Sequence, residues 1–103
     1  MSSMVESIEK EMKRRAYEAA MAILQSYQGQ VHEAMEEFQG GIRGFYRAND
    51  EYIPYWQREA READEWVYAD VRQIEMRIEA TADEWVDEIS REIARLRRMI
   101  EEL

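Results

Sequence analysis

His32 is the single histidine of the chain, and the residues around it come nearest to a metal site. His32 and Glu36 are four residues apart, which places both on one face of a helix, with Glu33 adjacent. A carboxylate-bridged di-iron bundle requires Glu-x-x-His on two helices, whereas residue 29, three before the histidine, is glycine. We therefore expect no bound metal or cofactor, and keep a small metal-binding helical-bundle enzyme as an alternative.

Other catalytic chemistry has little support in the residue types present. The chain has no cysteine, which removes disulfides, thiolate metal sites and thiol nucleophiles together. No serine occupies a nucleophile elbow, and no glycine-rich segment matches a phosphate-binding loop. We expect a protein that is not an enzyme and has no catalytic residues.

The formal net charge of −9 argues against direct contact with nucleic acid, because nonspecific affinity for phosphates comes from Lys and Arg. Residues 59–88 hold eleven of the acidic side chains and three arginines. Such a surface resembles the charge of nucleic acid itself. An acidic inhibitor that mimics nucleic acid is therefore a second alternative function.

Membrane and export signals are weak. The longest apolar run, Ala19 to Leu24, has six residues, against about 18 or more for a bilayer span. The first ten residues contain Glu6 and Glu9 and lack a basic leader with an apolar core. We expect no membrane association and a soluble, cytoplasmic protein.

Apolar residues recur in steps of three and four on both sides of the glycine-rich stretch Gly40 to Gly44, which predicts two amphipathic helices with a turn between them. We expect one all-α domain over 1–103, an antiparallel helical hairpin: helix 3–39, turn 40–49 and helix 50–102. The second helix is expected to be longer than the first. This register pairs Phe38 with about residue 50.

The surplus length predicts self-association into a helical bundle or coiled coil. Helix one would run out beside about residue 78, which leaves an apolar stripe of the second helix without a partner. Leaving five such side chains in water would forgo on the order of 10 kcal/mol. We therefore expect a homo-oligomer, with a dimer favoured. The predicted interface is Trp85, Ile89, Ile93, Leu96, Ile100 and Leu103.

Aromatic residues gather near the predicted turn, interleaved with arginines. One interpretation is an apolar cap that closes the end of the hairpin. The other is a recognition patch for a protein partner, because Tyr, Trp and Arg dominate interface hot spots. The candidate partner-binding residues are Phe45, Tyr46, Tyr52, Tyr55 and Trp56. We expect a structural or adaptor protein that presents this tip.

Phe38-Gln39-Gly40, followed by Tyr46, resembles the Trp-x-Gly turn and downstream aromatic of the small helical hairpins exported by type VII secretion. The resemblance implies a helical hairpin with its turn at Gly40 and an exported protein. The chain departs from that pattern because Phe38 replaces the tryptophan and no C-terminal tyrosine supplies an export signal. A type VII secretion-like hairpin is a third alternative.

Overall fold

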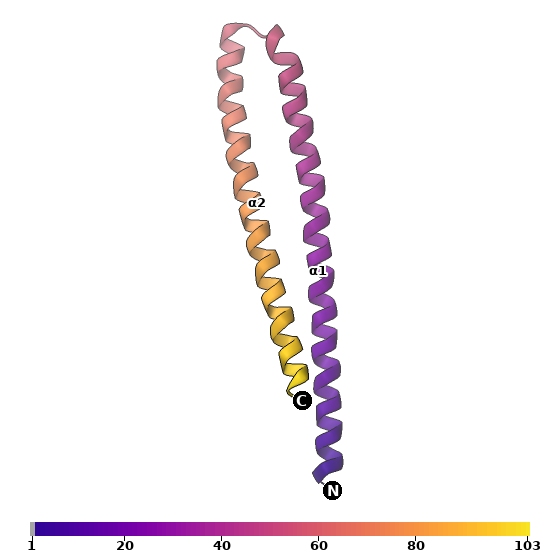
Figure 1. Cartoon of the computed structure of the whole chain (residues 1–103). Helices are drawn as coiled ribbons and strands as arrows, with labels where there is room; N and C mark the ends of the chain where they lie inside the picture. The colour runs from indigo at the N-terminus through magenta and orange to yellow at the C-terminus, as the bar shows by residue number, and fades with distance from the viewer. Residues whose placement is uncertain (1) are drawn as a thin grey trace. The chain divides into compact units, whose positions relative to one another are not determined.

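The computed structural model describes residues 2–103, and the side-chain exposure of residues 3–103. Over this range the chain forms helix α1 (Ser2–Tyr52), a short 3-10 helix η1 (Ile53–Tyr55) and helix α2 (Arg58–Glu101), without a β-strand (Figure 1). The predicted all-α helical hairpin is confirmed. The predicted order of lengths is wrong, because α1 has 51 residues and α2 has 44.

The position of the turn also differs from the prediction. Residues 40–49 are helical and continue α1, and no glycine in residues 2–103 has a positive φ. Glycine costs only about 1 kcal/mol in a helix interior. Apolar packing on either side outweighs that cost. The helix ends instead before Pro54, which has no backbone N–H to donate and disfavours helical geometry at Ile53.

The chain divides into two compact units, each made from both helices. We call Met1–Val31 with Glu84–Leu103 the terminal unit, and His32–Asp83 the tip unit. Within each unit a segment of α1 lies beside an antiparallel segment of α2 (Figure 1). The single domain predicted over 1–103 stays a prediction.

In the terminal unit, the Gln28 side-chain amide donates a hydrogen bond to Ser90 Oγ at 2.8 Å. Ile93 and Leu96 of α2 are buried, with 6% and 5% of their surface exposed. The predicted register would have placed Gln28 near residue 60. Because the turn lies near Pro54, α1 is longer and α2 is shorter than predicted. The last part of α2 therefore lies beside α1 of the same chain.

The surplus of helix therefore lies at the other terminus. Residues 3–16 of α1 are all exposed, and in Figure 1 the start of α1 extends past the end of α2. Four large apolar side chains in this stretch are exposed: Met4, Val5, Ile8 and Met12. The exposed apolar residues of this overhanging stretch thus belong to α1.

A series of buried and half-buried positions on α1 follows alternating steps of four and three residues, the spacing of a heptad repeat. The series is Tyr17, Met21, Leu24, Gln28, Val31, Met35, Phe38, Ile42, Phe45 and Asn49, and Ala20, Gln39 and Tyr46 are half-buried next to it. On α2 a series with the same spacing runs from Ala82 to Ile100, after two successive steps of four between Val71 and Glu79, and Glu92, Ala94 and Met99 are half-buried next to it. Each helix therefore turns one narrow face towards the other.

Candidate protein-interaction site at the hairpin tip

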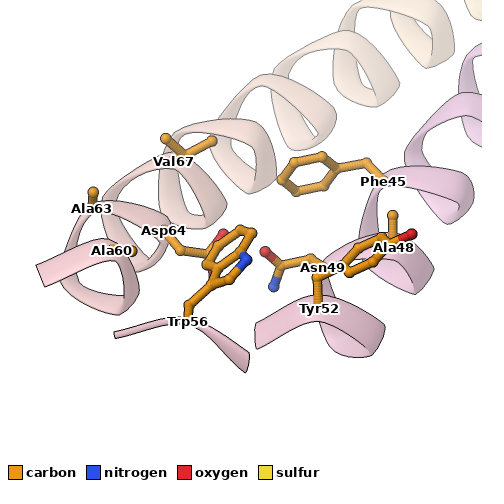
Figure 2. A pocket seen from close by; sticks show the side chains of 9 residues that line it. All are labelled: Phe45, Ala48, Asn49, Tyr52, Trp56, Ala60, Ala63, Asp64 and Val67. Carbon is orange, nitrogen blue, oxygen red and sulfur yellow. The ribbon is translucent and has the colours of Figure 1, made fainter. Parts of the chain in front are cut away.

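A cavity of about 460 Å³ lies in the tip unit, between the end of α1 and the start of α2 (Figure 2). Side chains from α1, from α2 and from the connection between them line it. The lining residues are Phe45, Ala48, Asn49, Tyr52, Trp56, Ala60, Ala63, Asp64 and Val67. The tip therefore holds an apolar recess with a few polar groups, the usual composition of a binding site.

The connection between the helices brings Trp56 to this cavity. Trp56 has extended backbone angles, φ −86° and ψ 143°, and its N–H donates to the Ile53 carbonyl at 3.1 Å. The Arg61 guanidinium donates to the Pro54 carbonyl at 3.5 Å, from the first turn of α2. Backbone geometry and these hydrogen bonds close the turn, and the Trp56 indole lies among the lining side chains in Figure 2.

The cavity is lined by both small and large side chains. Ala48, Ala60 and Ala63 leave space that a larger side chain would fill. Phe45 and Trp56 supply aromatic surface around it (Figure 2). The recess therefore results from the residue types at these positions. An apolar group of another molecule that entered it would contact aromatic surface.

Two polar side chains among the lining residues are buried: Asn49 and Asp64, each 7% exposed. Asn49 comes from α1 and Asp64 from α2, and in Figure 2 the Trp56 indole lies near both. An amide and a carboxylate placed in an apolar recess give it hydrogen-bonding capacity.

The predicted aromatic tip is only partly one cluster. Phe45, Tyr52 and Trp56 line the cavity, whereas Tyr55 is 83% exposed and is not among its lining residues. Tyr46 lies in a second aromatic contact, with ring centroids 5.7 Å from Phe45 and 5.0 Å from Tyr68. The prediction named three of the nine lining residues.

The Tyr46 hydroxyl donates a hydrogen bond to the Glu75 carboxylate. This hydrogen bond, followed by partial desolvation and the negative charge of Glu75, raises the pKa of Tyr46 to about 12. A phenol that keeps its proton in this way acts as a structural link between α1 and α2 in the tip unit.

Sequence reasoning missed Asn49 and Asp64 as site residues. Ala60, Ala63 and Val67 are three and four residues apart, a spacing that by itself indicates only one packed face of a helix. The signal that could have found the site was a polar residue facing the opposite helix on each side of Pro54, namely Asn49 and Asp64. Detecting it required the correct turn position.

The residues of the predicted oligomer interface lie in the terminal unit, and they differ in how far their side chains are exposed. Ile93 and Leu96 are buried within the chain, so the expectation that the stripe has no internal partner is wrong for them. Ile89, Ile100 and Leu103 are half-buried, and Trp85 is 56% exposed. A recess of about 290 Å³ places Trp85 and Ile89 beside Tyr27 and Val31 of α1.

His32 and Glu36 form an exposed pair, with Nε2 and Oε1 3.1 Å apart. Within the described part of the chain, no three His, Cys, Asp or Glu side chains gather closely enough to hold a metal ion. The pair is a contact along one helix face.

The segment resembling the type VII secretion turn has a different structure from the one the resemblance implied. Phe38-Gln39-Gly40 lies inside α1, and Phe38 is half-buried at a heptad position. The turn implied at Gly40 is therefore absent. Tyr46, the downstream aromatic, belongs to the same helix.

No family model matches the chain. No curated protein and no solved structure matches it either. Across residues 2–103, none of the helices combines the length and the apolar character that a bilayer crossing requires.

Proposed function

We propose that this chain is a non-enzymatic structural or adaptor protein of the cytoplasm, which binds a protein partner at the tip cavity and self-associates through its terminal unit. The tip cavity carries the proposal, because it joins apolar volume, aromatic surface and buried polar groups in one place. Aromatic residues in well-packed recesses are typical anchors of protein interfaces.

Partner binding at the tip is tested by site-specific photo-crosslinking. A benzoylphenylalanine replaces Tyr52, which lines the cavity, and in a separate variant replaces Trp66, which is 77% exposed and not a lining residue. We expect a discrete crosslinked protein from the Tyr52 position in native-source cells, and its loss with Trp56→Ala. Equal crosslinking from both positions would contradict a binding site at the cavity.

Self-association is supported by apolar surface that the terminal unit leaves exposed. Tyr27 is 51% and Trp85 is 56% exposed, and both line the recess of about 290 Å³. The heptad spacing of buried positions on α1 is typical of coiled coils. A second copy covering this face would give a four-helix bundle with a twofold axis, of the kind in which apolar faces are buried between hairpins.

Light scattering over a range of concentrations tests the self-association. We expect a dimer that a Tyr27→Ala, Trp85→Ala double variant weakens by about tenfold or more. The matched control is Trp66→Ala, an exposed tryptophan in the tip unit. A wild-type chain that stays monomeric while fully helical would exclude the dimer.

An acidic mimic of nucleic acid is the second candidate function. The tip unit holds thirteen Asp and Glu and six Arg, a formal charge of −7 of the −9 total. The chain should then compete with DNA for a basic protein, and the competition should weaken steeply with salt. Failure to compete at low salt would exclude this function and leave the adaptor proposal standing.

A further inference from the structure

Asp64 has an unusual position for a carboxylate: it is 7% exposed in a cavity otherwise lined mainly by apolar and aromatic side chains. Across residues 2–103, no hydrogen bond or ion pair joins its side chain to another residue. No side-chain oxygen or nitrogen in the described residues is both fully buried and unpaired, so the Asp64 carboxylate is open to the cavity and to a group that enters it.

The arginines nearest in sequence have other partners. Arg61 donates to the Pro54 carbonyl at 3.5 Å, and Arg58 Nε lies 3.5 Å from Glu62 Oε1 along α2. Asn49, the other buried polar residue of the lining, carries an amide and no charge. The negative charge in the cavity is therefore left for a cation from outside the chain.

Besides a counter-ion, the lining offers aromatic surface on which a cationic side chain can stack. Aromatic faces attract cations through the ring quadrupole, and Trp is the most effective of them. Trp56, Tyr52 and Phe45 all line the cavity that contains Asp64. An arginine suits this combination best, since its guanidinium binds a carboxylate with two parallel hydrogen bonds and stacks on aromatic rings.

We propose that the tip cavity binds an arginine side chain of the partner protein, with the Asp64 carboxylate as its counter-ion and Trp56 as its stacking surface. The Asn49 side-chain carbonyl offers a further acceptor for the guanidinium. This inference rests on the proposed partner binding at the tip and names the group that the cavity recognises. The net charge of −7 on the tip unit favours the approach of such a basic partner.

The test uses Nα-acetyl-arginine methylamide as the probe and the citrulline analogue, which has nearly the same shape without the charge, as its control. Binding is followed through the NMR signal of the Trp56 indole N–H, assigned with a Trp56→Phe variant. We expect the arginine probe to give a saturable shift in the millimolar range and the citrulline probe to bind at least about tenfold more weakly.

Asp64→Asn separates the charge from the shape of the cavity, since the two side chains are nearly isosteric. We expect this variant to weaken arginine binding by about tenfold or more. The matched control Asp70→Asn removes an exposed carboxylate of α2 outside the cavity lining, and should bind the probe within about twofold of wild type.

Three outcomes would overturn the inference: equal binding of citrulline and arginine, undiminished binding by Asp64→Asn, or no saturable shift with wild-type protein. If Asp64→Asn does not fold, the comparison of the two probes on wild-type protein decides. The photo-crosslinking from Tyr52 is independent of these results. A crosslinked partner together with an inert arginine probe would sink this inference alone, whereas the absence of any crosslinked protein from the Tyr52 position would sink the proposed function.

Discussion

The hydrogen bond from Gln28 to Ser90 Oγ, 2.8 Å long, joins residues sixty-two positions apart and sets the register of α1 and α2 in the terminal unit. With this pairing, the last fifteen residues of α2 have α1 beside them, and Ile93 and Leu96 become buried. The start of α1, residues 3–16, is left exposed instead. This register decides which residues of the terminal unit are buried and which are exposed.

The first prediction concerns the glycines inside α1. A Cβ added at Gly41 or Gly44 would meet no atom within 4 Å, and neither residue has a positive φ. Replacing each with alanine should raise the free energy of unfolding by about 0.5–1 kcal/mol, because alanine favours the helix and restricts the unfolded chain. Urea unfolding followed by circular dichroism measures the change. Destabilisation by both substitutions would indicate that the turn lies at these glycines.

A second prediction separates internal packing from an intermolecular interface. Leu96→Ala should lower the free energy of unfolding by about 2–4 kcal/mol, since this side chain is 5% exposed within a single chain. Ile8→Ala removes an apolar side chain of α1 that is 55% exposed, and should cost less than about 1 kcal/mol. Both are measured at a protein concentration low enough to keep the chain monomeric. Equal small losses would contradict burial of Leu96 by α1.

The third prediction concerns the response to high pH. The hydrogen bond to Glu75 raises the pKa of Tyr46 from 10.0 to about 12 in the folded state. The neutral phenol is therefore the form that the fold stabilises, and its contribution is fully present below pH 10 and lost as the pH rises towards 12. Titration of tyrosinate absorbance should show a late step that belongs to Tyr46.

Tyr46→Phe provides the control for that titration. The variant keeps the ring contacts with Phe45 and Tyr68 and lacks the hydroxyl that donates to Glu75. The late step should vanish from its titration. Persistence of the step would assign it to a different tyrosine and would contradict the hydrogen bond.

A fourth prediction compares truncations at the two ends. Removing residues 2–16 should change the free energy of unfolding by less than about 1 kcal/mol, because residues 3–16 are exposed. Removing residues 89–103 takes away Ile93 and Leu96 and should melt the remaining α1 segment of the terminal unit. Hydrogen exchange of residues 17–31 reports this loss. Retained protection after the second truncation would contradict their packing against α2.

Periodicity predicted the fold class because steps of three and four residues define helical faces whatever their partner is. It did not predict the turn. The glycines at 40–44 looked like a breakpoint, yet nothing local to them forbids a helix, whereas Pro54 lacks the N–H that a helix interior requires. The displaced turn moves the partner of Gln28 from about residue 60 to Ser90.

The same error explains the incomplete prediction of the tip. Phe45, Tyr52 and Trp56 were recognised by residue type, which does not depend on register. Asp64 and Asn49 could be recognised only from their burial on opposite sides of one cavity. That relationship follows from which residues of α1 face which residues of α2, and therefore required three-dimensional structure.

The register itself can be tested directly by cross-linking, because the chain has no cysteine of its own. Gln28→Cys with Ser90→Cys should join within one chain on treatment with a short bismaleimide, at a protein concentration too low for contact between chains. Gln28→Cys with Ala60→Cys, the pairing implied by a turn at residues 40–49, should remain unjoined. Efficient joining of residues 28 and 60, with none between residues 28 and 90, would contradict the hairpin described above.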